Sequence, residues 1–148
     1  MADFPGNDTL DDDITGTISG DNIFGLGGND LLRGERGNDL IEGGHGADYI
    51  EGGDGNDTLY GNSEGQNGLP WSIAGDDGND TIYGGSGFDF ILGNQADDRL
   101  YGGDGDDTIH GGRQSDTIEG GNGDDRLFGD GEDTEGNGEA GDDYLVGG

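Results

Sequence analysis

Large aliphatic residues recur every nine positions along this chain, and glycines and polar residues fill the spaces between them. The pattern is clearest at 43–60, which reads GGHGADYIE followed by GGDGNDTLY. Each nonapeptide has glycine at positions 1, 2 and 4, aspartate at position 6 and isoleucine or leucine at position 8. A fixed short period predicts a solenoid, in which each repeat is one structural unit and stacked units bury a continuous core.

The pattern continues, clearly or in degraded form, along nearly the whole chain. Fourteen units can be placed from residue 3 onward if 12–15, 61–74 and 129–137 are treated as irregular insertions. The stretch 61–74 lacks an aspartate but keeps an aliphatic in register at Ile73, so it is interpreted as one unit with an enlarged loop. This organisation predicts a single domain over 1–148.

The glycines predict that the first six positions of a unit form a turn, because glycine adopts dihedral angles that other residues avoid. Positions 7–9 then predict a very short strand whose position 8 points inward. If successive units form opposite sides of one flattened coil, the chain is an all-β parallel β-roll of about seven two-unit turns. The predicted inward side chains are Leu10, Ile23, Leu32, Ile41, Ile50, Leu59, Ile73, Ile82, Ile91, Leu100, Ile109, Ile118, Leu127 and Leu145.

Composition changes this picture by adding a requirement for cations. With 38 glycines, 26% apolar residues and a net charge of −30, the chain would by itself be expected to stay disordered. The regular spacing of the aliphatic residues instead favours a chain that folds once cations neutralise its acidic side chains. The same charge excludes nucleic acid and anionic membrane surfaces as partners. No apolar run approaches the roughly 20 residues of a membrane span, the N-terminus is not a secretory signal, and zero cysteines exclude a disulfide scaffold.

The aspartate at position 6 is the candidate metal ligand. Units two apart stack on the same side, so their carboxylates would repel one another unless a cation lay between them. Carboxylate and backbone carbonyl oxygens, without imidazole or thiolate, suit Ca²⁺ better than Mg²⁺. The predicted carboxylate ligands are Asp8, Asp21, Asp30, Asp39, Asp48, Asp57, Asp80, Asp89, Asp98, Asp107, Asp116, Asp125 and Asp143. The predicted carbonyl ligands are Gly43, Gly44, Gly46, Gly52, Gly53, Gly55, Gly84, Gly85, Gly87, Gly102, Gly103 and Gly105.

Stacking also predicts how many ions bind. One side carries the aspartates at 8, 30, 48, 89, 107 and 125, with Trp71 in the aspartate position between 48 and 89. The other side carries those at 21, 39, 57, 80, 98, 116 and 143. Pairs of neighbouring aspartates predict about ten Ca²⁺ ions, with a weak or missing site where Asp48 faces the Trp71 unit. Because the bound ions would neutralise much of the negative charge that keeps the chain expanded, we expect metal binding and folding to be one coupled event.

The units 43–51, 52–60, 84–92 and 102–110 match the full motif of the repeats-in-toxin (RTX) family, which the chain therefore resembles. The resemblance implies a right-handed parallel β-roll that is disordered without calcium. It also implies a secreted, extracellular protein that leaves the cell by type I export and folds in extracellular calcium. The family usually has a C-terminal export signal, which we expect to lie outside this sequence.

Two alternatives to a purely structural role stay open. Tyr60, Tyr83 and Tyr101 share position 9 of units two apart, so they predict an outer tyrosine row that either binds a polysaccharide or supports the β surface. A cell-surface component that associates end to end is the other alternative. Catalysis is not expected, because identical carboxylate pairs repeat along the chain whereas an enzyme needs one unequal pair in one pocket. His45 and His110 are expected to be exposed and incidental.

Overall fold

The structure is a computed structural model that describes residues 2–7, 10–46, 48–61, 71–130 and 143–147. Within these residues the regular secondary structure is entirely β, and no helix is long and apolar enough to cross a membrane. The strands are β1 Asp3–Pro5, β2 Asp13–Thr15, β3 Asn22–Gly27, β4 Leu31–Arg36, β5 Leu40–His45, β6 Tyr49–Asp54, β7 Thr58–Tyr60, β8 Trp71–Asp77, β9 Thr81–Ser86, β10 Asp89–Gln95, β11 Arg99–Asp104, β12 Thr108–Gly112, β13 Thr117–Asn122, β14 Arg126–Asp130 and β15 Tyr144–Val146.

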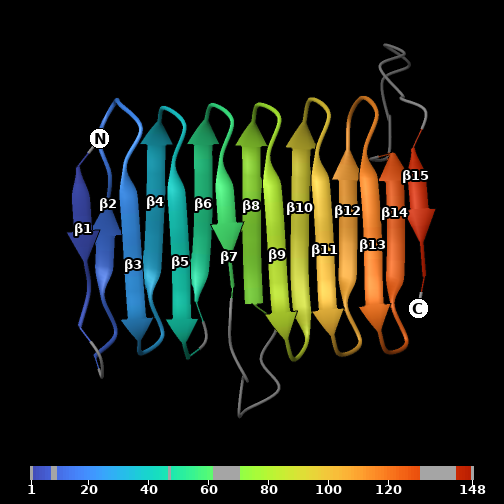
Figure 1. Ribbon diagram of the computed structural model, residues 1–148, viewed down its shortest axis with the longest axis horizontal. Coiled ribbons are helices and arrows are strands. Elements are labelled where there is room, and N and C mark those ends of the chain that lie inside the picture. Colours follow the sequence, from blue (N-terminus) through green and yellow to red (C-terminus); the bar gives the residue numbers. More distant parts are fainter. Residues whose placement is uncertain (1, 8–9, 47, 62–70, 131–142, 148) are drawn as a thin grey trace.

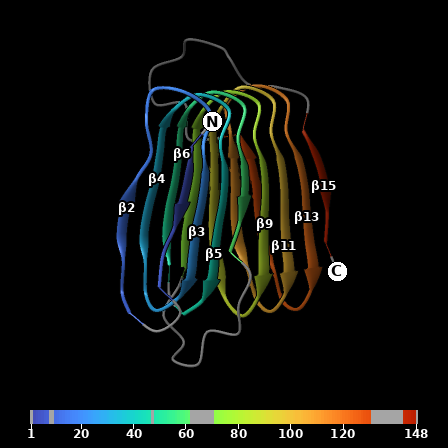
Figure 2. The same ribbon diagram turned by 60° about the vertical axis from the view of Figure 1, so that its left-hand side comes forward.

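The strands form two parallel sheets that the chain visits alternately. The odd-numbered strands make an eight-stranded sheet in the order β1 to β15, and the even-numbered strands make a seven-stranded sheet in the order β2 to β14. The strands stand side by side along the long axis (Figure 1), and a turned view shows the two sheets face to face (Figure 2). This arrangement confirms the predicted parallel β-solenoid. We call the two layers the odd sheet and the even sheet.

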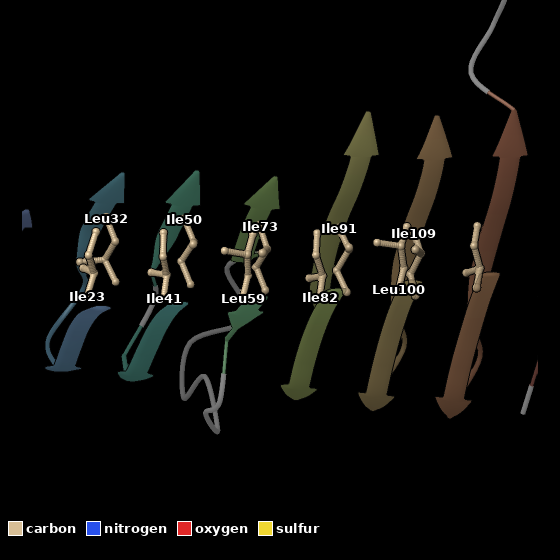
Figure 3. Close-up of a cluster of buried hydrophobic side chains, with 11 residues drawn as sticks. Ile23, Leu32, Ile41, Ile50, Leu59, Ile73, Ile82, Ile91, Leu100 and Ile109 are labelled. Atoms are coloured by element: carbon tan, nitrogen blue, oxygen red, sulfur yellow. The ribbon is translucent and has the colours of Figure 1, made fainter. Parts of the chain in front are cut away.

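One aliphatic side chain from each unit forms the core between the sheets (Figure 3). The eleven fully buried members are Ile23, Leu32, Ile41, Ile50, Leu59, Ile73, Ile82, Ile91, Leu100, Ile109 and Ile118. At two side chains a turn, they correspond to about six turns of closed coil, slightly fewer than the seven predicted. At the ends, Leu127 is only partly buried and Leu145 is 43% exposed. Each fully buried side chain stabilises the fold by about 1.5–3 kcal/mol.

The first unit differs from its prediction. Leu10 is 58% exposed, so its predicted place in the core is wrong. Ile14 instead lies opposite Leu32 on the even sheet, and Phe4 lies opposite Ile23 on the odd sheet. The stretch 12–15, predicted as an insertion, therefore belongs mostly to β2, because Ile14 supplies the apolar side chain that this position of the core requires.

The strands are also longer than predicted. Most have five to seven residues, because pairing continues from positions 7–9 into the first positions of the next unit, as where Leu26 pairs with Gly44. The prediction that the first six positions form only a turn was therefore wrong. Position 2 takes a positive φ inside the strand, 101° at Gly44. At some units position 4 also needs glycine for space, because a Cβ on Gly105 would overlap the carbonyl oxygen of Gly87.

The two later irregular stretches follow the predicted register. Trp71 pairs with Asp89, so it occupies the aspartate position of its unit. Leu145 pairs with Ile118, which confirms that 129–146 is one unit. Residues 129–130 belong to β14, so the extra residues of this unit come after them. Residues 62–70 and 131–142 lie outside the described residues.

Candidate metal centre

The position-6 aspartates form two rows, one at each edge of the solenoid. We call those that lead into even-numbered strands the even row and those that lead into odd-numbered strands the odd row. The even row is Asp12, Asp30, Asp48, Asp89, Asp107 and Asp125, and the odd row is Asp21, Asp39, Asp57, Asp80, Asp98, Asp116 and Asp143. Most are buried as fully as the aliphatic core, with Asp57 2% and Asp80 0% exposed. Full burial of a carboxylate is costly unless it is paired.

Within each row, one carboxylate oxygen is held by the neighbouring turn. The backbone N–H of Asp39 donates to Oδ1 of Asp57 at 2.8 Å, and that of Asp57 donates to Oδ1 of Asp80 at 2.7 Å. The even row repeats the contact, with 3.0 Å from the N–H of Asp30 to Oδ1 of Asp48. These bonds fix the orientation of each carboxylate, so the second oxygen always faces into its own turn.

That second oxygen, Oδ2, is buried without a hydrogen-bond partner in most of the rows. The aspartates concerned include Asp30, Asp39, Asp48, Asp57, Asp80, Asp89, Asp98, Asp107 and Asp125. An unsatisfied buried acceptor costs about 1–3 kcal/mol, and more when it is charged. Repeated along two rows, this cost reaches the whole net stability of a typical domain, about 5–15 kcal/mol. The fold therefore requires a further positive partner for these atoms.

The space beside each orphaned oxygen has the donor set of a hard cation. A Cβ placed on Gly52 would lie 2.5 Å from Oδ2 of Asp57 and 2.7 Å from the carbonyl oxygen of Gly75. On the even row, a Cβ on Gly84 would lie 2.5 Å from Oδ2 of Asp89 and 2.6 Å from a carbonyl oxygen of the next turn. Glycine at position 1 thus keeps open a space that a carboxylate and a carbonyl oxygen share.

Burial also changes the protonation of the rows. Loss of water raises the pKa of Asp80 to about 8 and the pKa of Asp57 to about 7, and neighbouring carboxylates raise both further. The same cause raises the pKa of Asp89 and Asp98 to about 7, and of Asp48 to about 6. Without a cation, these side chains therefore compete for protons near neutral pH. A bound divalent ion would reverse that preference by favouring the carboxylate.

The structure places most of the predicted carboxylates in the rows, with a change at the N-terminal end. Asp8 lies outside the described residues, and Asp12 occupies the row position below Asp30, donating its N–H to Oδ1 of Asp30 at 2.8 Å. At the other end, Oδ1 of Asp143 accepts the N–H of Asp116 at 2.9 Å. The Trp71 unit interrupts the even row, as the register predicted.

Asp21 differs from the other buried members of the odd row. Its Oδ2 accepts both the backbone N–H and the hydroxyl of Thr17, each at 2.7 Å. The Thr17 hydroxyl lowers the pKa of Asp21 below its ordinary value, in contrast to the raised values elsewhere in the rows. This carboxylate therefore already has the partners that the regular turns lack.

The predicted carbonyl ligands fall into two groups. At position 1, the carbonyls of Gly43, Gly52 and Gly102 lie beside a carboxylate of the preceding turn, whereas that of Gly84 approaches Gly61, whose unit has no aspartate. At positions 2 and 4, the carbonyls of Gly55, Gly85, Gly87, Gly103 and Gly105 approach a glycine of the following turn. Among the described residues no group of three or more His, Cys, Asp or Glu side chains converges on one point. Any metal site here therefore combines few carboxylates with backbone oxygens.

A second row at position 5 was missed from the sequence. The N–H of Asn56 donates to Oδ1 of Asn38 at 3.2 Å, that of Asn79 to Oδ1 of Asn56 at 3.0 Å, and that of Asp97 to Oδ1 of Asn79 at 3.2 Å. At position 5 each N–H donates to the side chain of the preceding unit in the row, whereas at position 6 each N–H donates to that of the following unit. The frequent Asn or Asp at position 5 was the signal that could have revealed this row.

The outer face of the odd sheet carries the predicted tyrosine row. The ring centroids of Tyr60 and Tyr83 are 5.0 Å apart with 7° between the planes, and those of Tyr83 and Tyr101 are 4.9 Å apart with 9°. The rings therefore cover one another's faces and present mainly their edges to solvent. This geometry favours a supporting role for the β surface, since a sugar ring packs against an exposed aromatic face.

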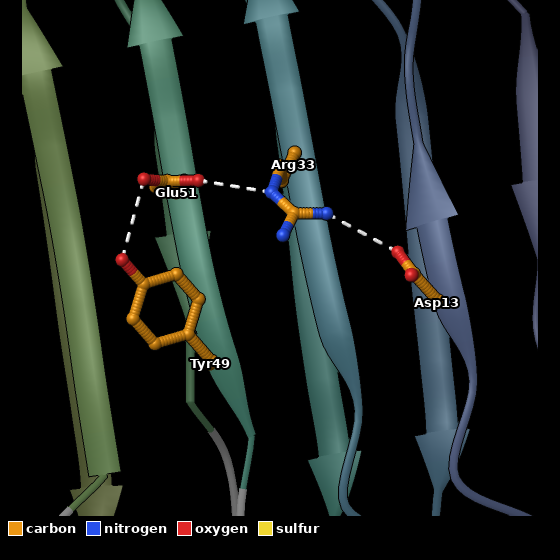
Figure 4. A network of polar contacts seen from close by, with 4 residues as sticks. All are labelled: Asp13, Arg33, Tyr49 and Glu51. Carbon is orange, nitrogen blue, oxygen red and sulfur yellow. Dashed lines mark hydrogen bonds and ion pairs between the residues drawn. The ribbon is translucent and has the colours of Figure 1, made fainter.

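The outer face of the even sheet is aromatic near its C-terminal end and charged near its N-terminal end. His110 stacks on Phe128 with centroids 4.5 Å apart, so it is half-buried and not exposed as predicted, while its lack of a ligand role stays a prediction. Toward the N-terminus, Arg33 bridges Asp13 and Glu51 at 3.2 Å each, which joins β2, β4 and β6 (Figure 4). Exposed ion pairs of this kind contribute at most about 1 kcal/mol.

Comparison with known families agrees with the geometry of the rows. The model of the RTX calcium-binding nonapeptide repeat matches residues 5–41, 15–50, 37–64, 74–109, 101–134 and 137–148. These segments contain every aspartate of both rows. No curated protein matches the chain. Its repeats, its solenoid fold and this match together show that the chain belongs to the family of RTX calcium-binding nonapeptide repeats.

Proposed function

We propose that this calcium-binding β-solenoid is a structural module whose folding is driven by calcium itself. The observation that carries the proposal is the set of buried Oδ2 atoms in the two rows, which have no hydrogen-bond partner. A divalent cation would supply the missing positive charge and join oxygens of stacked turns. The apolar core, with one aliphatic side chain per unit, is too thin to hold so acidic a chain together alone.

The proposed ligands are the row aspartates together with position-1 carbonyls. Asp57 and the carbonyl of Gly75 share one space, and Asp89 and the carbonyl of Gly102 share another. The hydrogen bonds to Oδ1 hold each carboxylate so that Oδ2 faces this space. All donors are oxygens, which suits calcium, and calcium tolerates the irregular geometry that backbone donors impose better than magnesium does.

Coupling of binding to folding also suggests where the module works. A chain of net charge −30 stays expanded where calcium is scarce and becomes compact where calcium is abundant. We therefore place it in an exported protein that crosses the membrane unfolded, by type I-like secretion, and folds in extracellular calcium. The charge of the chain and its RTX repeats support this proposal.

A calcium titration of the full chain, followed by far-UV circular dichroism and sedimentation, tests the proposed function. We expect an expanded chain in chelator and at micromolar calcium, and a compact β signal at millimolar calcium, but not at millimolar magnesium. The variant Asp57→Ala should require more calcium, whereas Asp124→Ala, at an exposed position 5, should behave as the unaltered chain. A chain that is equally compact and β-rich in excess chelator would contradict the proposal.

Polysaccharide binding through hydrogen bonds to the tyrosine hydroxyls is the second candidate, although the stacking of the row leaves mainly ring edges exposed. The row offers hydroxyl groups at regular spacing, with Arg99 in the neighbouring column of the same sheet. A glycan-binding screen of the calcium-loaded chain, with and without Tyr83→Ala, tests it. Binding that survives this substitution would remove the tyrosine row as the site.

A further inference from the structure

The segments that lead into β2 and β3, which we call the first two turns, satisfy their aspartates with protein hydrogen bonds. Oδ2 of Asp12 accepts the backbone N–H of Asn7 at 2.6 Å, and Oδ2 of Asp21 accepts the N–H and hydroxyl of Thr17. Thr17 occupies position 2 of its unit, four residues before Asp21. Asn7 aligns with position 2 in the observed register, because Pro5 pairs with Phe24 of position 9, and it precedes Asp12 by five residues. In each turn the aspartate therefore receives a donor at the oxygen that is orphaned in the regular turns.

The backbone at position 2 separates the two kinds of turn. Every aspartate with an orphaned Oδ2 follows, by four residues, a residue of positive φ; these include Leu26, Glu35, Gly44, Gly53, Asp76, Gly85, Asn94, Gly103 and Gly121. Asn7 and Thr17 do not have positive φ. Leu26 and Glu35 adopt this uncommon conformation at 74° and 79°, although side chains disfavour it. The conformation therefore belongs to the regular turn and does not depend on glycine.

The direction of the position-2 N–H explains the separation. In a regular turn this N–H takes part in sheet pairing, as where Gly44 donates to the carbonyl of Gly61 at 3.2 Å. At Asn7 and Thr17 it points to the carboxylate of its own turn instead, and the strands β1 and β2 stop before position 1. An N–H aimed at Oδ2 occupies the lone pair that a cation would use and places partial positive charge in the same space.

We propose that the first two turns are closed to calcium and form a metal-independent N-terminal cap, with Asn7 and Thr17 as the groups that replace the ion. The odd row ends at this cap, because the N–H of Ala2 occupies the next row position and donates to Oδ1 of Asp21 at 2.8 Å. The proposal rests on the proposed function and specifies which turns of the module take ions.

The cap changes the expected number of sites. The prediction of about ten ions counted one between the first two members of each row. With both of these positions closed, the sites flanked by two aspartates number three in the even row and five in the odd row. The even-row sites lie at the pairs 30/48, 89/107 and 107/125, and the odd-row sites lie at 39/57, 57/80, 80/98, 98/116 and 116/143. The full sites therefore begin at Asp30 and Asp39.

Counting bound calcium per chain at saturation, by equilibrium dialysis and elemental analysis, tests the cap. We expect Asp21→Asn to leave the count unchanged, and Asp39→Asn, the matched variant one turn along the same row, to lower it by one. Equal losses for the two variants would overturn the cap. If the unaltered chain binds no calcium, the proposed function fails instead, so the two failures are distinguishable.

A gain-of-site variant gives an independent test. Thr17→Gly removes the hydroxyl and permits positive φ at position 2, so the count should rise by one. Thr17→Ser keeps both donors and should leave the count unchanged. A count that is the same for both variants, with the Thr17→Gly chain as compact as the unaltered one by sedimentation, would show that position 2 does not decide whether a turn takes an ion.

Discussion

The aliphatic core and the aspartate rows are built from the same repeat, two positions apart, and both are buried. Asp80 and Ile82 are each 0% exposed, yet their burial has opposite consequences. Burial of Ile82 stabilises the fold whether or not calcium is present. Burial of Asp80 removes its hydration, and it stabilises the fold only if a proton or a cation compensates the lost hydration. The solenoid therefore has one layer that always stabilises the fold and two edges whose contribution depends on the solution.

The largest contrast between the two regions should appear as a function of pH, since pH acts on many row carboxylates together. Burial raises the pKa of Asp80 to about 8 and of Asp98 to about 7, above the ordinary value, so without calcium the folded chain binds more protons than the unfolded chain. In chelator, stability should therefore rise as pH falls from about 8 toward 4. In saturating calcium it should fall over the same range, because calcium requires ionised carboxylates.

Circular dichroism of the chain at a series of pH values, with chelator and with calcium, measures both trends. The core contains no titratable side chain, so it should contribute equally in the two series. A chelator-treated chain that loses β signal on acidification would contradict the raised pKa values of the rows.

A core substitution should lower stability at saturating calcium and raise the calcium midpoint of folding only by as much as that loss of stability explains. Ile82→Ala removes a fully buried side chain and leaves a cavity, which should cost about 2–5 kcal/mol in saturating calcium. Denaturant unfolding in saturating calcium measures the loss. Ile18→Ala, at a residue 80% exposed, is the control and should change stability little.

A row substitution should do the reverse and act mainly through calcium. Asp80→Asn keeps the shape of the side chain but removes one charge, so the calcium concentration at the folding midpoint should rise, at a cost of about 1–3 kcal/mol in calcium. In chelator the same variant should be at least as compact as the unaltered chain, because one buried charge is gone. Asp124→Asn controls for net charge. An Asp80→Asn chain that is less compact in chelator would show that the carboxylate stabilises the fold without metal.

The smallest effect should come from the outer surface. Tyr83→Ala breaks both ring contacts of the tyrosine row, which should cost about 0.5–1.5 kcal/mol at any calcium concentration that folds the chain. Denaturant unfolding at two saturating calcium concentrations checks this. Tyr144→Ala, 66% exposed on the last strand of the odd sheet, is the control. The lost stability should account for any change in the calcium midpoint of folding. A larger change in the midpoint would show that the tyrosine row affects calcium binding.

The period of the sequence was sufficient to predict which positions form the core and the rows. Ile73 and Leu145 were assigned to their columns across irregular loops, and both pair as expected. This succeeded because a strand register that slips by one residue would expose the aliphatic side chain, so the pattern allows one solution. The match of Trp71 to the aspartate position follows from the same constraint.

Local detail was less predictable, because neighbouring strands decide it. Leu10 and Ile14 are equally aliphatic, and only the pairing of β2 with β4 selects Ile14. Glycines at positions 1 and 2 indicated a turn, but pairing on both sides extends the strand through them. The closure of the first turns depends on φ at Asn7 and Thr17, and a non-glycine residue there did not reveal it, since Leu26 adopts the opposite conformation.

The stacked tyrosines give the chain an internal optical reporter. Tyr60, Tyr83 and Tyr101 are distant in sequence and come within 5.0 Å of a neighbour only when β7, β9 and β11 lie side by side. Near-ultraviolet circular dichroism depends on such fixed aromatic packing and is lost when specific packing is lost. The closing of the middle of the solenoid can thus be followed in the unlabelled protein, separately from the far-ultraviolet signal of its strands.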